Sequence, residues 1–389
     1  MYTGKGIIVK KTTLSKTLIA FAALGAFSVA AHAQSSVTLY GSLDAGLAYV
    51  NNIGGHSTWL QSSSLLSNTY FGLKGEEDLG GGLKAIFKLE SGFDLSNGGF
   101  SDDGMFNRQA YVGIASRDFG TLTLGRQYDS VVDYLSPLAL AGQAGDVNVA
   151  AHPLNNDNIG AQYSIKNAVK YESVNYSGFH FGGLYGFSNQ PGQFANGRAW
   201  SVGAGYSMGP LKLAAAYDQT NSDTNSVNNS AAATVPFGGN VKRTFGVGGN
   251  YTFGPATAGV LWTRTRIQGA TVAGFDGMDA RFDNIEVNGT YSLTPSLALV
   301  GEYTYTYGKT TGGGTDGSSP KWHSATLAVD YSLSKRTDVY VAGAYQHASG
   351  DIYNNGSYSV ANTANIAGLL GNSSTQSQVA ATIGMRHRF

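Results

Sequence analysis

Apolar and polar side chains alternate along most of the chain with a period of two residues. Within residues 37–50, for example, Val37 and Leu39 fall on one face, and Thr38 and Tyr40 fall on the other. The same alternation continues to the last twelve residues, QVAATIGMRHRF. Successive side chains of a strand point to opposite faces, and no comparable stretch shows the 3.6-residue period of a helix. The pattern therefore predicts an all-β protein.

We count sixteen such segments. They are predicted to begin near Val37, Ser67, Leu83, Phe106, Thr121, Lys166, Phe179, Ala199, Leu211, Arg243, Ala256, Ala280, Ser296, Lys321, Arg336 and Gln378.

The links between these segments alternate in length. Seven are short and carry the glycine and proline residues of tight turns. Eight are long: 51–66, 93–105, 130–165, 189–198, 219–242, 267–279, 308–320 and 348–377. Short turns at one end and long loops at the other are typical of an antiparallel transmembrane β-barrel, whose long loops are external. An even number of strands lets the first and last strands pair and leaves no open edge in the lipid.

The predicted number of strands also predicts a function. Eight strands make a barrel that side chains can fill, whereas sixteen to eighteen strands leave an aqueous channel. We therefore expect passive passage of small hydrophilic solutes and ions. A channel specific for sugars or carboxylates is the alternative, and a membrane-embedded barrel enzyme is a more distant one.

Composition adds a membrane context. Residues 1–33 contain four lysines, a short apolar run and the sequence Ala31-His32-Ala33, which together predict a secretory signal peptide. The remaining barrel domain, 34–389, has 21 basic and 25 acidic residues and no cysteine. Charged residues make up only 13% of the chain, against about 25% in soluble domains. No basic cluster suggests nucleic-acid binding, and the seven scattered histidines predict no metal or other cofactor.

Several motifs, in order along the chain, resemble the Gram-negative trimeric general porins, especially their beta-proteobacterial branch. These are SSVTLYGSLDAGL, FGLKGEEDLGGGLKAIFKLESGF, FNRQAYVGI, FGTLTLGRQYD, LSKRTDVYVAGAY and GMRHRF. The resemblance implies a bacterial outer-membrane location, a homotrimer, and a third external loop, 130–165, folded into the lumen as a constriction. The apolar content of that loop, including SPLALAG, independently favours a packed position.

The resemblance also implies a transverse field at the constriction, with basic residues on the wall and acidic residues on the inserted loop. The matching wall residues are Arg108 and Arg126, with Lys74, Lys88 and Lys166 as further candidates; the loop candidates are Asp133 and Asp146. Arg108 faces the lumen only if Tyr111 faces outward or if a bulge intervenes.

The chain departs from the family at two positions. Tyr70 and Ser164 stand where relatives often carry arginine, so the anion preference of relatives does not transfer directly. The terminal Phe389 is implied to be a signal for the barrel-assembly machinery. Contacts with outer-membrane lipids and lipopolysaccharide are implied as well.

Overall fold

The computed structural model describes residues 36–101, 104–143, 147–192, 194–221, 239–272, 275–350, 363–369 and 371–389. The predicted signal peptide lies outside these residues.

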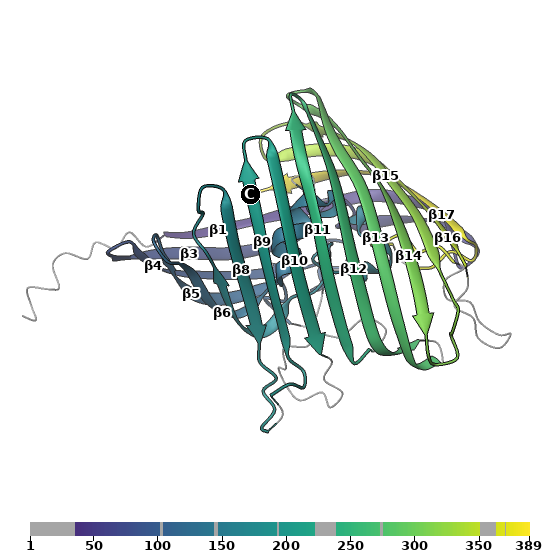
Figure 1. Cartoon of the computed structure of the whole chain (residues 1–389). Helices are drawn as coiled ribbons and strands as arrows, with labels where there is room; N and C mark the ends of the chain where they lie inside the picture. The colour runs from purple at the N-terminus through teal and green to yellow at the C-terminus, as the bar shows by residue number, and fades with distance from the viewer. Residues whose placement is uncertain are drawn as a thin grey trace, which may run out of the picture.

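Seventeen antiparallel strands in the described residues close into one barrel (Figure 1). They are β1 (Ser36–Ile53), β2 (His56–Ser63), β3 (Tyr70–Gly80), β4 (Leu83–Gly92), β5 (Gln109–Ser116), β6 (Gly120–Gln127), β7 (Ile165–Glu172), β8 (Phe179–Gly186), β9 (Ala199–Met208), β10 (Leu211–Asn221), β11 (Val241–Phe253), β12 (Ala256–Val272), β13 (Phe275–Thr294), β14 (Leu297–Thr311), β15 (Lys321–Ser332), β16 (Thr337–Ser349) and β17 (Ser377–Arg388).

Strands β2 and β3 occupy one position of the barrel in succession. Both pair with β1: β3 with residues 36–42 and β2 with residues 45–53. The ring therefore has sixteen strand positions, which confirms the predicted sixteen-stranded antiparallel barrel.

Two of the predicted long loops are wrong, because strands extend into them. Gly54 and Gly55, both with positive φ, turn the chain directly from β1 into β2, so 51–66 is not one long loop. Strand β12 runs to Val272 and β13 begins at Phe275, so most of 267–279 is strand. In both places, polar or charged residues on the outward face obscure the alternation.

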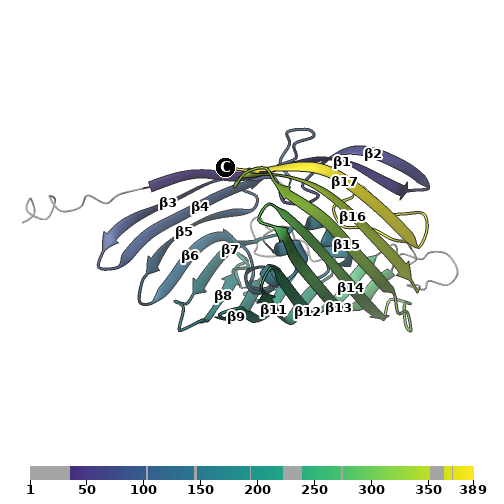
Figure 2. The same cartoon turned by 90° about the horizontal axis from the view of Figure 1, so that it is seen from above.

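The barrel closes where β1 pairs with β17, from Ser42 opposite Arg388 to Val50 opposite Ala380 (Figure 2). The backbone of Phe389 extends this pairing, exchanging two hydrogen bonds of 3.1 Å with Gly41. A Cβ atom on Gly41 would lie 2.6 Å from the Phe389 ring, so glycine makes room for the aromatic side chain there.

The alternation of β17 separates an outer face from an inner one, as predicted. Ile383 is 60% exposed on the outside, whereas Arg386 is 1% exposed on the inside. Arg386 donates a hydrogen bond to Asp330 (2.8 Å), and its Nε lies 3.0 Å from Asp338. The polar residues beneath the closing strands thus neutralise one another inside the barrel. No helix in the described ranges is long and apolar enough to span a membrane.

Candidate functional site

The segment between β6 and β7, residues 128–164, folds into the interior of the barrel (Figure 2). Its described part contains five short helical turns: η1 (Val131–Leu135), η2 (Ser136–Leu138), η3 (Leu140–Gly142), η4 (Asn148–Ala150) and η5 (Pro153–Asn155). Turn η1 contacts β9, β10 and β11, and η4 contacts β15. This segment, called the inserted loop below, confirms the predicted third loop in the lumen.

One side of the inserted loop packs on the wall formed by β9 to β12. Buried Val131, Leu135 and Ile159 form a cluster with small or aliphatic wall residues. Gly203 and Gly246 make the close approach possible: a Cβ atom there would lie 2.4 Å from the Tyr134 ring and 2.5 Å from Leu135. Apolar burial therefore holds this side of the loop against the wall.

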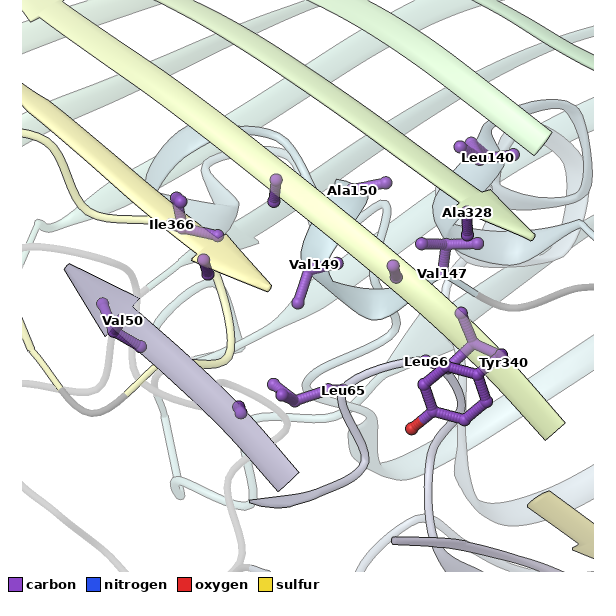
Figure 3. Close-up of a cluster of buried hydrophobic side chains, with 14 residues drawn as sticks. Val50, Leu65, Leu66, Leu140, Val147, Val149, Ala150, Ala328, Tyr340 and Ile366 are labelled. Atoms are coloured by element: carbon purple, nitrogen blue, oxygen red, sulfur yellow. The ribbon is translucent and has the colours of Figure 1, made fainter. Parts of the chain in front are cut away.

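The other side reaches the region where the barrel closes (Figure 3). There a second buried cluster joins the loop to β1, β15, β16 and two connecting segments. Its labelled members are Val50, Leu65, Leu66, Leu140, Val147, Val149, Ala150, Ala328, Tyr340 and Ile366. The loop is therefore fixed at both sides of the barrel.

A buried charged cluster adds a third attachment. The His152 ring is fully buried; its Nδ1 lies 2.6 Å from Asp157 and its Nε2 lies 3.0 Å from Glu286 on β13. Asp157 also accepts a 2.5 Å hydrogen bond from Thr263 on β12, and Glu286 accepts one of 2.7 Å from the Leu140 backbone. His152 thus joins two carboxylates, one on the loop and one on the wall.

The ionisation of this cluster follows from its geometry. Burial alone would lower the pKa of His152, but the carboxylates of Asp157 and Glu286 outweigh it and raise that pKa well above its ordinary value. Burial would likewise raise the pKa of Asp157, but the His152 cation lowers it to about 2. Both groups are therefore charged at neutral pH.

Basic residues gather on the inner wall of β3, β4 and the segment before β5. Lys74 and Lys88 lie directly opposite each other, and their ammonium groups lie 5.1 and 5.7 Å from the centre of the Tyr40 ring. Arg108 donates Nε to Glu90 at 2.7 Å, and Lys88 lies 3.2 Å from the same carboxylate. Lys88 and Arg108 thus share one carboxylate, and Lys74 lies beside them over the Tyr40 ring. We call this part of the wall, with Lys74, Lys88 and Arg108, the basic wall.

A bulge brings Arg108 to the inside. Its backbone N–H donates to the Glu90 carbonyl (3.1 Å), although the Cα partner of Glu90 is Gln109. Arg108 and Gln109 therefore both lie opposite Glu90, and this extra residue shifts the inward–outward alternation of the strand by one position. As a result Tyr111 lines an inner pocket with Lys74 and Lys88, while Arg108 still reaches Glu90.

A cavity of about 310 Å³ lies between the basic wall and the inserted loop. Arg108 lines one side, and Tyr128, Tyr163 and Ser164 line the other. The inserted loop, packed on the walls described above, thus leaves an open cavity beside Arg108.

The remaining predicted residues are more dispersed. Arg126 donates Nε to Ser164 at 2.6 Å. Asp133 forms an ion pair with Lys170 on β7 and does not face the basic wall across the cavity. No ion-pair partner of Lys166 is found within the described part of the chain, and Asp146 lies outside it.

Tyr70 and Ser164, which stand where relatives often carry arginine, each contact one of the arginines predicted to line the wall. The Arg108 guanidinium lies 4.9 Å from the centre of the Tyr70 ring, and Ser164 accepts the hydrogen bond from Arg126. An aromatic ring and a hydroxyl therefore position these guanidinium groups without adding positive charge.

Sequence reasoning missed four charged residues: Glu90, His152, Lys170 and Glu286. The alternation of β4 and β13 places Glu90 and Glu286 on the inner face, which was a usable signal. His152 and Lys170 acquire partners only through the path of the loop, so the sequence carried no signal for them. Across the residues that the structure describes, no cluster of potential metal ligands is found.

Comparison with known proteins agrees with this architecture. The family model described as Gram-negative porin matches residues 20–351. An outer membrane porin protein of Bordetella pertussis is 33% identical, with 85% of this chain and 94% of that protein covered.

Solved structures agree as well. An anion-selective porin from Comamonas acidovorans has a TM-score of 0.72 at 25% identity and covers 92% of this chain and 100% of its own. A trimer form of OmpT from Vibrio cholerae, at 18% identity, has a TM-score of 0.63 and covers 91% of this chain and 99% of its own. The second likeness concerns the fold alone.

The closed barrel, the loop inside it and the match over most of the chain lead to one conclusion. The chain belongs to the Gram-negative porin family and is a non-enzymatic channel for passive diffusion across the bacterial outer membrane.

Proposed function

We propose that the passage beside Arg108 is the constriction of the channel and that it favours anions. The observation that carries this proposal is the basic wall, where Lys88 and Arg108 share the carboxylate of Glu90 and Lys74 adds a third cation over the Tyr40 ring. A wall with excess positive charge attracts anions and repels cations at the narrowest point. The similarity to a porin described as anion-selective supports the same sign.

The inserted loop contributes little opposing charge in the described residues. Asp133 is paired with Lys170, so its charge is largely compensated locally. Arg126 and Lys166 are proposed to reinforce the positive potential from β6 and β7. Asp146 remains a proposed counter-charge of the loop.

Reversal potential in a salt gradient across a planar bilayer tests this proposal. The variant K88Q/R108Q should shift the reversal potential toward cation preference. One unit charge about 5 Å from an ion in water contributes about 0.8 kcal/mol, so each removed charge changes the permeability of an ion by about fourfold. The matched variant E90Q removes the carboxylate and should shift the reversal potential the opposite way.

An unchanged reversal potential in both variants would show that the basic wall does not lie at the constriction. The same recordings separate a general channel from one specific for sugars or carboxylates, because a specific channel shows saturable block by one solute.

The proposal includes a homotrimer. A similar barrel is known in a trimer form, and three channels per particle would appear as conductance increments in groups of three. During biogenesis, Phe389 is proposed to be read by the barrel-assembly machinery. In the mature protein, the outward face is proposed to contact outer-membrane lipids and lipopolysaccharide.

A further inference from the structure

Two histidines lie directly opposite each other on neighbouring strands of the barrel. His323 on β15 is paired with His347 on β16. Side chains at such positions share a face, and their Cβ atoms are about 5 Å apart. The turn between the two strands separates the residues in the sequence, so only the register of the strands brings their rings together. We call these two residues the histidine pair.

The burial of neighbouring residues places the histidine pair on the outside of the barrel. Trp322 and Ala348, each next to one of the histidines in the sequence, are buried toward the interior. Leu327, which shares the parity of His323, is 71% exposed. His323 is the third residue of β15, and His347 is the third from the end of β16, at the end of the barrel that carries the long loops. The pair therefore lies at the outer surface near the external rim.

A hydroxyl group orients each of the two rings. The Nδ1 atom of His323 lies 2.6 Å from the Tyr303 hydroxyl on β14, and that of His347 lies 2.9 Å from the Ser377 hydroxyl on β17. Strands β14 and β17 flank β15 and β16, so the two hydroxyls lie on the far sides of the pair. Because Nε2 lies on the opposite edge of an imidazole from Nδ1, the two Nε2 atoms are turned toward each other.

The Nε2 atoms are the ones available to a ligand. For neither of them is a hydrogen-bond partner found among the residues that the structure describes. When an imidazole donates its Nδ1–H to a hydroxyl oxygen, its Nε2 carries the lone pair. Histidines that bind metal ions usually donate the other ring N–H in this way, which fixes the ring and its tautomer. Two nitrogens about 2 Å from one ion lie about 3.3 Å apart, which directly opposite side chains can reach.

We propose that the histidine pair binds a first-row transition-metal ion through its two Nε2 atoms, with Cu²⁺ bound more tightly than Ni²⁺ or Zn²⁺. Imidazole suits these ions, whereas Mg²⁺ and Ca²⁺ prefer oxygen ligands. The described ranges contain no group of three or more potential ligands, so water completes the coordination. Lys321, the next outward residue of β15, disfavours ions that bind by charge alone. The proposal does not rest on the proposed constriction.

The test measures binding of Cu²⁺ to the full-length protein in detergent by calorimetry. Electron paramagnetic resonance of the bound Cu²⁺ counts its nitrogen ligands, and the tightest site should show two. The variants H323Q and H347Q should each bind Cu²⁺ at least about 100-fold more weakly, because even loss of a hydrogen-bond partner of a ligand costs about 10- to 100-fold. Ni²⁺ and Zn²⁺ should displace part of the Cu²⁺, whereas an excess of Mg²⁺ should not.

The flanking hydroxyls give a readout that two independent surface histidines would not give. Y303F and S377A keep both imidazoles, and each removes one of the hydroxyls that orient them. Each variant should therefore bind Cu²⁺ about 10-fold more weakly. Unchanged affinity in both variants would overturn the proposal, because the bound ion would then not depend on the geometry of the pair. The shift in electrophoretic mobility between unheated and heated samples verifies that every variant is an assembled barrel.

The matched control is H56Q. His56 is exposed on β2 at the same end of the barrel, and its partner across the strands is Ile53 rather than a second histidine. H56Q should bind Cu²⁺ as the wild type does. Equal affinities of H323Q, H347Q and H56Q would overturn the proposal. So would a single nitrogen ligand in the spectrum of the wild type, or displacement of Cu²⁺ by Mg²⁺, which would indicate oxygen ligands.

Discussion

The His152 cation neutralises two carboxylates, one on the inserted loop and one on the barrel wall. Two carboxylates from different parts of the chain contact its ring, and none of the three side chains is exposed. Breaking a buried ion pair by removing one partner leaves an uncompensated charge, which costs about 3–5 kcal/mol. Of the three side chains, that of His152 is therefore the one whose removal should loosen the loop most.

We expect His152→Gln to detach that part of the loop, because Asp157 and Glu286 then repel each other without a cation between them. Protease cleavage within residues 128–164 should become faster, and single-channel current should become noisier. The double variant H152Q/D157N removes one carboxylate together with the cation and should recover part of the protection. Equal cleavage of wild type and H152Q would show that the apolar clusters alone hold the loop.

The same cluster predicts a response to pH. The folded-state pKa of Asp157 is lowered to about 2, so its stabilisation is present above about pH 4 and is lost as the pH falls toward 2. The raised pKa of His152 has the opposite sign: its stabilisation is fully present below the ordinary histidine pKa of about 6.5 and is lost progressively as the pH rises from there through the raised value.

Protease protection of the loop should therefore be greatest between about pH 5 and pH 6.5, fall by about 2 kcal/mol toward pH 2, and also decline as the pH rises above about 6.5. Cleavage by pepsin at the acidic end and by a neutral protease elsewhere, each compared with D157N, measures the change. A midpoint near pH 6 would contradict the assignment of a charged His152 at neutral pH.

Among the elements, the inserted loop depends on two glycines of the wall. Tyr134 and Leu135 pack directly against Gly203 on β9 and Gly246 on β11, where a Cβ atom would clash with them. Glycine weakens a strand, so its presence at these inward positions is explained by the loop that it accommodates.

The variant G203A/G246A should displace turn η1 from the wall. Overpacking of this kind typically costs about 1–3 kcal/mol, and the barrel itself should remain folded. Faster cleavage within 128–164 with an unchanged strand signal in circular dichroism would be the expected result. The matched control is G343A, because a Cβ atom on Gly343 would contact only the Ala380 carbonyl oxygen, at 3.8 Å. Equal protection of the loop in both variants would contradict the prediction.

At the scale of the whole molecule, closure of the barrel depends on residues more than three hundred positions apart. Strands β1 and β17 pair over nine residues, and the Phe389 backbone continues this pairing to Gly41. Contacts of such long range form late and at a high entropic cost, which makes closure a sensitive step of folding.

Deletion of Phe389 should lower the yield of assembled barrel severalfold, because it removes two backbone hydrogen bonds and an aromatic contact at the closing edge. The folded fraction can be measured from the shift in electrophoretic mobility between unheated and heated samples. Phe389→Tyr keeps the ring and should assemble normally. Channels that do form without Phe389 should conduct as the wild type does; a changed conductance with a normal yield would contradict the role in assembly.

The sequence allowed most of the architecture to be predicted. Strand starts near Leu83, Phe179 and Leu211 coincide with those of β4, β8 and β10, because the period of two is a local property of each strand. The prediction failed within 267–279, where outward residues such as Gln268 and Asp279 are polar or charged, because the alternation then carries no apolar signal.

The candidate site was less predictable. The sequence identified Arg108 and Lys88 as basic wall residues, and the structure brings both to Glu90. It could not pair Asp133 with Lys170, since that contact depends on how the loop crosses the lumen. It also could not decide the face of Arg108, because one bulge reverses the alternation.

The sequence by itself determined a closed antiparallel barrel of sixteen strand positions, wide enough for a channel. The reason is that side-chain alternation and link length are local properties of the sequence. Only the tertiary structure decided which charges meet. The basic wall and the His152 cluster each bring together residues from different strands or loops. Register and loop path fix those contacts, and neither is encoded in the spacing of any single segment.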